Sequence, residues 1–446
     1  MKLSYYTIIV DDYPNKGESL VYNTRTQALI KLDRGLSEAI KNLSEQTQQR
    51  YREEIKLLHN NGILVLDEEE ENRRIEDFFH QLKEGIRKAS FPVSVLTTYA
   101  CNFDCEYCFQ KSSRVNEAMS KDTAYALIEW VEARVLRLGY EEVYIVFYGG
   151  EPLLNTSVID IIASKMNKFC RSKGLKFRFM LQTNGYLLNR EHVEKYLPLG
   201  LSQVRISVDG VGYAHDRNRH LPDGTPTFDR IMDNIVACVD DVSIGISCSY
   251  ENGDITHIEE LLDYLDDIGI LYKLGEFMFS PIHPSLGPSG HAQDICQCEH
   301  MNNYAEGSLI NAVYQIRKLM AEKRLPMRSG LSIVACPLTR RYGGVTIDQR
   351  GRIFKCNSML GHPEFSVGNI WENSFNKTHE DFLNLDVWEK CPRSCPYLPM
   401  CSGGCRMFSF LKNRSFSTPV CFKSYLDALA PEFIKWDYNA INSNGS

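Results

Sequence analysis

The chain has 446 residues, of which 43% are hydrophobic and 24% charged, and its formal net charge is −7. This composition is typical of a globular protein with a hydrophobic core, and the length predicts about two to four domains. The negative charge argues against a general nucleic-acid-binding protein, because such proteins are usually basic. No apolar run reaches the roughly 18 residues that span a bilayer, and residues 1–14 turn acidic too early for a signal peptide. We therefore expect a cytoplasmic protein that binds neither nucleic acid nor membrane.

Residues 1–85 predict a separate small α+β domain. The expected elements are two strands, two helices and a closing strand, at 5–12, 19–24, 36–46, 51–62 and 63–67. Strands followed by helices and a final strand indicate a winged-helix-like fold. The acidic run 67–72 is expected to be a solvated linker outside any binding site.

Residues 90–300 alternate apolar strands with amphipathic helices. The strands are expected at 92–100, 142–150, 176–185, 202–210, 242–250 and 272–281. Six such units predict an α/β fold with a parallel sheet. The strands end in Gly-rich or polar turns, which is where ligands bind in parallel α/β folds.

The remainder of the chain divides into three parts. Residues 301–335 contain one further helix that bridges to residues 336–425, which are rich in cysteine and only weakly periodic. A region with so little apolar periodicity needs another source of stability, and bound metal is a common one. Residues 426–446 are expected to form a C-terminal tail.

Cys101, Cys105 and Cys108 form the densest group among the 15 cysteines, with the spacing C-x3-C-x2-C. In a reducing compartment, clustered cysteines more often bind metal or perform chemistry than form disulfides. Zinc sites usually pair C-x2-C knuckles with two distant ligands, whereas three thiolates on a cubane cluster leave one iron open. Zinc binding or unligated core cysteines remain the alternatives.

The stretch CNFDCEYC at 101–108 follows an apolar strand and resembles the radical S-adenosylmethionine (SAM) superfamily. The resemblance implies that these three cysteines bind a [4Fe–4S] cluster whose open iron chelates the amino and carboxylate groups of SAM. One electron then splits SAM into methionine and a 5′-deoxyadenosyl radical, which abstracts hydrogen from an unactivated position. The fold implied is a partial (β/α)6 barrel of the radical SAM type.

Further motifs at the strand ends support this resemblance. YGGEPLL at 148–154 matches the family's GGEP motif, and QTNG at 182–185, RISVDG at 205–210 and HDRNR at 215–219 follow in order. By position, Tyr107 would lie near the adenine, Ser207 and Asp209 near the ribose, and Arg219 near the SAM carboxylate. The full set implied for SAM binding is Tyr107, Gly149, Gly150, Glu151, Pro152, Thr183, Asn184, Ser207, Asp209 and Arg219. Each polar residue taken alone could equally cap a turn.

The C-terminal cysteines resemble the SPASM extension of radical SAM peptide-modifying enzymes, which carries two auxiliary [4Fe–4S] clusters. Cys336 begins C-x14-G-x4-C, C-x3-C-x5-C-x3-C begins at Cys391, and Cys421 follows. The family usually has C-x2-C where this chain has C-x3-C. The resemblance assigns the outer cluster to Cys391, Cys395, Cys401 and Cys421. It assigns the inner cluster to Cys336, Cys356 and Cys405, which makes three clusters in all, and a zinc ribbon is the alternative.

The fourth ligand of the inner cluster is open, because the stretch 328–335 before Cys336 has no cysteine. Either Cys296 or Cys298 reaches in from the preceding loop, or an open iron binds a substrate thiolate. Cys296 and Cys298 could also act catalytically as thiols that give or take hydrogen, or they could be ordinary loop thiols.

Residues 1–85 resemble the recognition element of ribosomal-peptide maturases, which adds a leader peptide as a strand to a sheet edge. The function expected is a radical SAM peptide maturase that installs a crosslink, with a thioether as first choice. Its partners would be a precursor peptide with a leader and an electron donor such as flavodoxin or ferredoxin. The alternatives are a carbon–carbon or ether crosslink, epimerisation, a formylglycine-generating sulfatase-type maturase, and a zinc-stabilised binding protein. For residues 1–85 alone, a capping subdomain without a peptide remains open.

Overall fold

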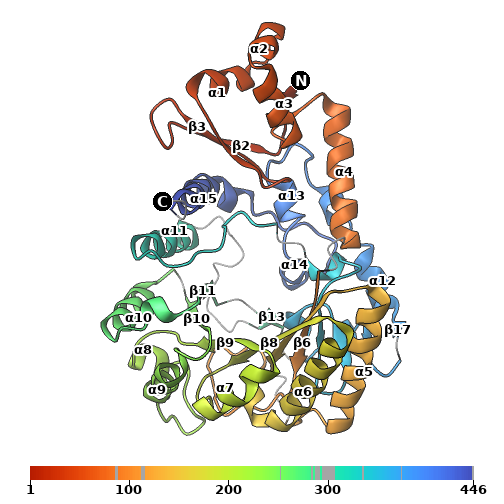
Figure 1. The fold of residues 1–446 in the computed structure, drawn as a ribbon, viewed down its shortest axis with the longest axis vertical. Helices are drawn as coiled ribbons and strands as arrows, with labels where there is room; N and C mark the ends of the chain where they lie inside the picture. The colour runs from red at the N-terminus through yellow and green to blue at the C-terminus, as the bar shows by residue number, and fades with distance from the viewer. Residues whose placement is uncertain are drawn as a thin grey trace.

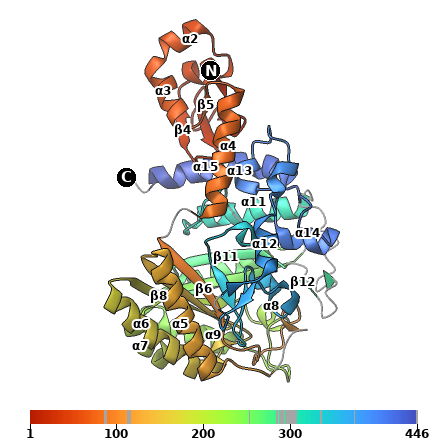
Figure 2. The same cartoon turned by 90° about the vertical axis from the view of Figure 1, so that its right-hand side faces the viewer.

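The computed structural model describes residues 1–85, 89–111, 116–251, 253–282, 285–286, 292–293, 307–333, 336–372 and 374–443. Figures 1 and 2 show an elongated molecule with the N-terminal elements at one end of the long axis and the large sheet with its helices at the other. The C-terminal helices α13, Leu398–Cys401, and α15, Lys423–Ser443, lie between these two ends in both views. In the described residues, no helix combines the length and hydropathy needed to cross a bilayer.

The N-terminal domain is a small antiparallel sheet between two layers of helix. Its elements are β1 Lys2–Leu3, β2 Thr7–Asp11, β3 Ser19–Asn23, β4 Leu29–Leu32, α1 Arg34–Lys41, α2 Glu45–Arg50, α3 Arg52–Asn60 and β5 Leu64–Val65. The sheet order is β2-β3-β4, and β1 pairs separately with β5. Val21 and Leu32 pack with residues of α1 and α3, whereas Leu20 and Tyr22 pack with residues of α15, including Leu429. Alternate residues of β3 thus face opposite layers, as the pleat requires.

The acidic run 67–72 is not a linker, which corrects the expectation from the sequence. It begins the 17-residue helix α4, Glu68–Glu84, whose N-cap is Asp67. Acidic side chains in a first turn interact favourably with the helix dipole, so a run of glutamates favours a helix start here. Glu71 is buried and accepts hydrogen bonds from the Ser4 hydroxyl and the Tyr5 backbone N–H, which fixes α4 to the N-terminal domain.

The central part confirms the predicted parallel sheet with six βα units. Its strands are β6 Ser90–Leu96, β7 Glu142–Tyr148, β8 Lys176–Thr183, β9 Leu201–Ser207, β10 Ile244–Tyr250 and β11 Glu276–Pro281. They pair in sequential order and all run parallel. The helices between them are α5 Lys121–Leu138, α6 Thr156–Lys173, α7 Arg190–Tyr196, α8 Tyr213–Asp216, α9 Phe228–Cys238 and α10 Thr256–Asp267. Since the strands are parallel, their carboxyl ends and the loops that follow meet along one edge.

The C-terminal region extends this sheet, which the weak sequence pattern did not indicate. Strand β14, Val345–Ile347, pairs in parallel with β6, and β15 Arg352–Phe354, β16 Gly368–Asn369 and β17 Ser374–Phe375 follow in antiparallel order. The two regions share one hydrophobic core. The remaining elements are β12 Ser285–Leu286, β13 Ala292–Gln293, α11 Gly307–Glu322, α12 Lys377–Leu383, α13 Leu398–Cys401, α14 Arg406–Asn413 and α15 Lys423–Ser443. The range expected as a C-terminal tail thus belongs mostly to α15.

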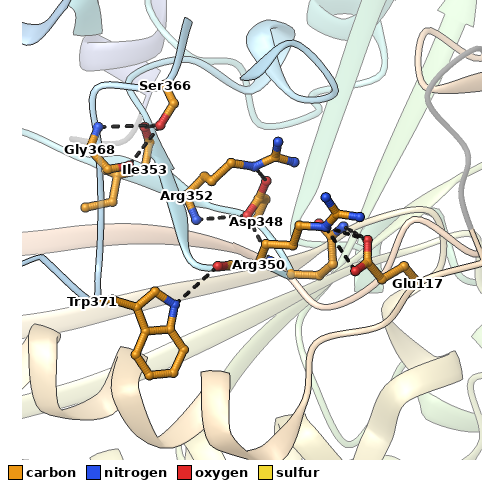
Figure 3. Close-up of polar contacts among 9 residues, drawn as sticks. Glu117, Asp348, Arg350, Arg352, Ile353, Ser366, Gly368 and Trp371 are labelled. Atoms are coloured by element: carbon orange, nitrogen blue, oxygen red, sulfur yellow. Dashed lines mark hydrogen bonds and ion pairs between the residues drawn. The ribbon is translucent and has the colours of Figure 1, made fainter. Parts of the chain in front are cut away.

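The turn between β14 and β15 is held by a buried carboxylate and is linked by an ion pair to the loop before α5 (Figure 3). Asp348 accepts the backbone N–H groups of Arg350 and Arg352 and the Nε of Arg352, the last at 2.6 Å. Arg350 reaches outward and forms an ion pair with Glu117 at 2.8 Å. The Trp371 indole N–H donates to the Arg350 carbonyl at 3.4 Å.

Candidate active site

Cys101, Cys105 and Cys108 lie in the loop after β6, at the carboxyl edge of the parallel sheet. All three line one cavity of about 530 Å³, a size typical of small-molecule and cofactor sites. The backbone N–H of Phe103 donates to the Cys101 sulfur at 3.4 Å, and the Asn184 side-chain amide lies 3.9 Å from the same sulfur. The sequence therefore places three thiols where parallel α/β folds bind ligands.

Gly149 and Gly150 fit the end of β7 against the backbone that leads into Cys101. The Gly150 N–H donates to the Thr98 carbonyl at 2.9 Å. A Cβ on Gly149 would lie 2.5 Å from the Thr98 oxygen, and a Cβ on Gly150 would lie 2.3 Å from the Ala100 oxygen. Both glycines also line the cavity. Close backbone packing thus explains both glycines, and the same small residues leave the cavity wall free of side chains.

Glu151 is fully buried and ties the ends of two strands together. Its carboxylate accepts the Thr183 hydroxyl at 2.8 Å and the backbone N–H groups of Asn184 and Leu153 at 2.8 and 3.0 Å. Burial raises the pKa of Glu151 to about 7, although these hydrogen bonds act in the opposite direction. Glu151 and Pro152 lie behind the cavity lining, whereas Thr183 and Asn184 are part of it.

Asp209 lies behind the cavity and holds two residues that line it. Tyr107 donates a short hydrogen bond to its carboxylate, and Arg219 Nε lies 2.6 Å from the same oxygen. The Ser249 backbone N–H donates to the other oxygen at 2.8 Å. Burial alone would raise the pKa of Asp209, but the charge of Arg219 and the hydrogen bonds from the Tyr107 hydroxyl and the Ser249 N–H hold it below its ordinary value. The ionised carboxylate therefore orients Tyr107 and Arg219 at the cavity wall.

The structure adds cavity residues that the sequence reasoning missed. Gln182, Ser247 and Ser249 lie at the ends of β8 and β10, beside the predicted Ser207 of β9. Alternation along the strand ISCSY could have shown that Ser247 and Ser249 share a face. The C-terminal region also lines the cavity, with Ser358, Met407, Phe408 and Leu411, which the sequence did not indicate, and with Cys405. Cys405, predicted as an inner-cluster ligand, thus lines the same cavity as the first three thiols.

Among the C-terminal thiols, Cys336 lies near Cys356 and Cys405, and Cys391 lies near Cys395 and Cys421. Burial, to which the neighbouring Cys405 and Cys356 add, raises the pKa of Cys336 to about 11. Burial raises the pKa of Cys391, to which Cys395 and Cys421 add. Burial also raises the pKa of Cys401 to about 11, and the nearby Cys391 and Cys395 act in the same direction. Cys296 and Cys298 lie outside the described residues.

Backbone N–H groups point at many of these sulfurs in a repeated local pattern. The Phe103 N–H donates to the Cys101 sulfur, and in four further cases the backbone N–H two positions after a cysteine favours its thiolate and so lowers its pKa. The pairs are Cys101 with Phe103, Cys336 with Leu338, Cys356 with Ser358, Cys395 with Tyr397 and Cys401 with Gly403. An N–H donor stabilises a thiolate over a thiol, and thiolates are the form that binds metal.

This donor set fits iron–sulfur clusters. The buried thiols would stay protonated by themselves, and a coordinated metal removes that proton. In the ranges that the structure describes, no three His, Cys, Asp or Glu side chains converge on a point as around a single ion. Cubane ligands need no such convergence, because each cysteine binds a different iron. The residues present therefore fit cluster binding, both at the loop after β6 and in the two C-terminal groups.

Comparison with known proteins identifies sequences that are similar to the part of the chain that carries this site. Residues 95–265 match the model of the radical SAM superfamily. A stretch of 174 residues is 30% identical to an uncharacterized protein of Methanocaldococcus jannaschii, covering 39% of this chain and 57% of that protein. The matched part of this chain thus covers less than two thirds of the length of that relative. A stretch of 342 residues is 24% identical to a cysteine-type anaerobic sulfatase-maturating enzyme of Clostridium perfringens, covering 71% of this chain and 89% of that enzyme.

Solved structures extend the similarity across the chain. A crystal structure of SuiB from Streptococcus suis, bound to precursor peptide SuiA, aligns with a TM-score of 0.56. The alignment covers 95% of this chain and 99% of that one, with 15% identical residues. At this identity the likeness concerns the fold.

Proposed function

We propose that this chain, whose residues 95–265 match the radical SAM superfamily, is a radical SAM enzyme that modifies a ribosomally made precursor peptide by installing a radical-derived crosslink, a thioether in the first place. The family implies a [4Fe–4S] cluster and SAM. When bound, they supply a 5′-deoxyadenosyl radical that removes a hydrogen atom from the substrate. Cys101, Cys105 and Cys108 would hold the cluster, because they share one cavity at the sheet edge.

The walls of that cavity would hold SAM. Seven of the ten predicted contacts line it, namely Tyr107, Gly149, Gly150, Thr183, Asn184, Ser207 and Arg219. Glu151, Pro152 and Asp209 lie behind them, so we assign these three a positioning role. Arg219, whose charge is fixed by Asp209, suits a carboxylate ligand, and Ser207 and Asn184 suit hydroxyl and amino groups.

Two auxiliary clusters would be held by the two C-terminal thiol groups. Cys391, Cys395, Cys401 and Cys421 supply four ligands, and Cys336, Cys356 and Cys405 supply three. The position of Cys405 is the observation that carries the proposal, because it brings the inner group to the cavity where substrate hydrogen would be removed. A fourth inner position, filled by Cys296, Cys298 or a substrate thiolate, stays a prediction.

Thioether formation releases an electron, and a cluster beside the cavity could accept it. Its formation removes two hydrogens from the peptide: one leaves the acceptor carbon as an atom, and one leaves the thiol as a proton. Closing the carbon–sulfur bond then releases one electron, which must leave the cavity. A redox-active group beside the cavity meets that need, and an external donor such as flavodoxin or ferredoxin would supply the electron for SAM cleavage.

The N-terminal domain would bind the leader of the precursor. Its three-stranded sheet ends in the short strands β2 and β4, which can accept an added strand by backbone hydrogen bonding. The similarity to SuiB, whose structure holds a precursor peptide, covers this part of the chain as well. The domain also contacts the loop between Cys391 and Cys395, since the Tyr6 hydroxyl donates to the Arg393 carbonyl at 3.0 Å.

The second candidate is oxidation of a protein cysteine to formylglycine. It is favoured by the similarity to the sulfatase-maturating enzyme over 342 residues. The two candidates differ in the mass of the product, because a crosslink retains sulfur and loses two hydrogens whereas formylglycine formation removes the sulfur.

The experiment is an anaerobic reaction of the reconstituted protein with SAM, a reductant and candidate cysteine-containing peptides encoded beside its gene. Mass spectrometry that shows loss of two hydrogens, with tandem fragments that place a crosslink, supports the proposal. Loss of sulfur from the peptide contradicts it in favour of the second candidate. A Cys105→Ala variant is the control, for which no 5′-deoxyadenosine is expected.

A further inference from the structure

Arg406 is a fully buried cation beside the proposed auxiliary clusters. It directly follows Cys405 and is the first residue of α14. Its side chain is 1% exposed and is the largest fully buried side chain among the described residues. Charged side chains are rarely buried to this degree unless they are paired, so its surroundings require an explanation.

The guanidinium donates its hydrogen bonds to neutral backbone carbonyls. Nη1 donates to the carbonyls of Phe416 and Thr418 at 2.8 and 3.1 Å, and Nε and Nη2 donate to that of Gly404 at 3.2 and 2.9 Å. A further short hydrogen bond reaches the Gly403 carbonyl. These bonds satisfy the N–H groups and fix the side chain in place, but they do not balance its charge.

Arg406 forms no ion pair with a carboxylate in the part of the chain that the structure describes. The negative groups that act on it most strongly are the thiols of Cys336 and Cys405 of the inner group and of Cys401 and Cys391 of the outer group. The side chains of Arg406 and Cys336 also line the same small cavity. Arg406 therefore lies next to both thiol groups, with its charge unbalanced until the thiols become thiolates.

Bound clusters would provide the missing negative charge. A guanidinium keeps its proton in proteins, and a buried charge without a counterion is strongly unfavourable. A cubane cluster with thiolate ligands is anionic, and net charge and hydrogen bonds to sulfur help to set its reduction potential. A fixed cation stabilises the reduced, more negative form, so it raises that potential.

We propose that Arg406 is a positioning residue that raises the reduction potentials of both auxiliary clusters, because its buried charge follows Cys405, is held by the backbone between Cys401 and Cys405, and lines a cavity with Cys336. This inference rests on the proposed auxiliary clusters. It explains why the residue after Cys405 is a cation that is held by carbonyls from the loop before Cys421.

The test compares three variants of the full-length protein, each reconstituted anaerobically and then titrated with reductant while its cluster signals are followed by electron paramagnetic resonance. Arg406→Gln removes the buried charge and keeps part of the hydrogen bonding. Arg406→Lys keeps the charge but cannot reproduce the fork of hydrogen bonds. Arg414→Gln removes the same charge from the exposed end of the same helix and serves as the control.

We expect Arg406→Gln to keep its iron and to shift both auxiliary potentials to more negative values, with the SAM cluster unchanged. Arg406→Lys should stay near the wild type, and Arg414→Gln should match it. Full iron content with unchanged potentials in Arg406→Gln overturns the inference. If Arg406→Gln loses iron, Arg406→Lys decides: wild-type iron and potentials support the charge role, and loss of iron in both overturns it. A wild-type protein with only about four irons instead overturns the proposed auxiliary clusters themselves.

Discussion

The backbone N–H of Asn184 donates a 2.8 Å hydrogen bond to the buried carboxylate of Glu151, which joins the end of β8 to the end of β7. Through this carboxylate, the turn with Gly150 and the turn with Asn184 are fixed relative to each other at the wall of the cavity. Glu151 is thus a support for the site, although it does not line it.

Replacing Glu151 by Ala should therefore destabilise the fold and loosen the SAM site. Three buried donors would lose their acceptor, and each unsatisfied buried group costs about 1–3 kcal/mol. We expect a lower free energy of unfolding in urea and weaker SAM binding by calorimetry, with the iron of the nearby cluster retained. Wild-type stability in Glu151→Ala would contradict this role.

The pH dependence of stability should carry the signature of Glu151. Its pKa is raised by burial from an ordinary 4.5 to about 7 in the folded state. The unfolded chain then releases this proton at lower pH than the folded one, so the stabilisation is fully present below pH 4.5 and is lost as the pH rises to about 7. In urea melts between these values, Glu151→Gln should remove this part of the slope. An unchanged slope in the variant would show that other groups carry it.

Asp209→Ala should be strongly destabilising, because it leaves the Arg219 guanidinium buried without its counterion. Breaking a buried ion pair in this way costs about 3–5 kcal/mol. Arg190→Ala is the matched control, since its ion pairs with Glu194 and Asp241 are at the surface and its side chain is 62% exposed. We expect a change of about 0–1 kcal/mol for the control. Equal effects of the two substitutions would contradict the account.

The β14–β15 turn allows a second comparison within one hairpin (Figure 3). Asp348→Ala removes a fully buried acceptor of two backbone N–H groups and of Arg352, whereas Arg350→Ala removes a largely exposed partner of Glu117. Thermal unfolding should show a large loss for Asp348→Ala, about 2–4 kcal/mol, and little change for Arg350→Ala. The opposite order would show that the ion pair to Glu117 stabilises the hairpin more than the buried carboxylate.

The sequence could predict the parts of the site that depend on local spacing. The six parallel strands follow from their repeated pattern, and the thiols from 101 to 108 follow from one loop. Gly150 shows a limit of such reasoning, because its packing against the Ala100 carbonyl is a contact between two loops. The same holds for Cys405, whose place in the cavity depends on how α14 is oriented over the sheet edge.

Local composition was misleading at two places, where the surrounding structure stabilises an element that the residues alone do not indicate. The glutamates after Asp67 indicated a solvated linker, but a helix N-terminus favours acidic residues, and Glu71 found donors in Ser4 and Tyr5. The weak periodicity after Cys336 likewise concealed β14, because a strand of three residues is too short to show alternation. Its pairing with β6 is specified by the neighbouring strand and not by its own pattern.

The most direct test of the central claim is the iron content of the anaerobically reconstituted protein, measured beside that of a variant with Cys101, Cys105 and Cys108 all replaced by Ala. Three cubane clusters predict about twelve irons per chain in the wild type and about eight in the variant. The variant should also form no 5′-deoxyadenosine from SAM. A variant that keeps all the wild-type iron, or a wild-type protein that binds zinc in place of iron, would contradict the account.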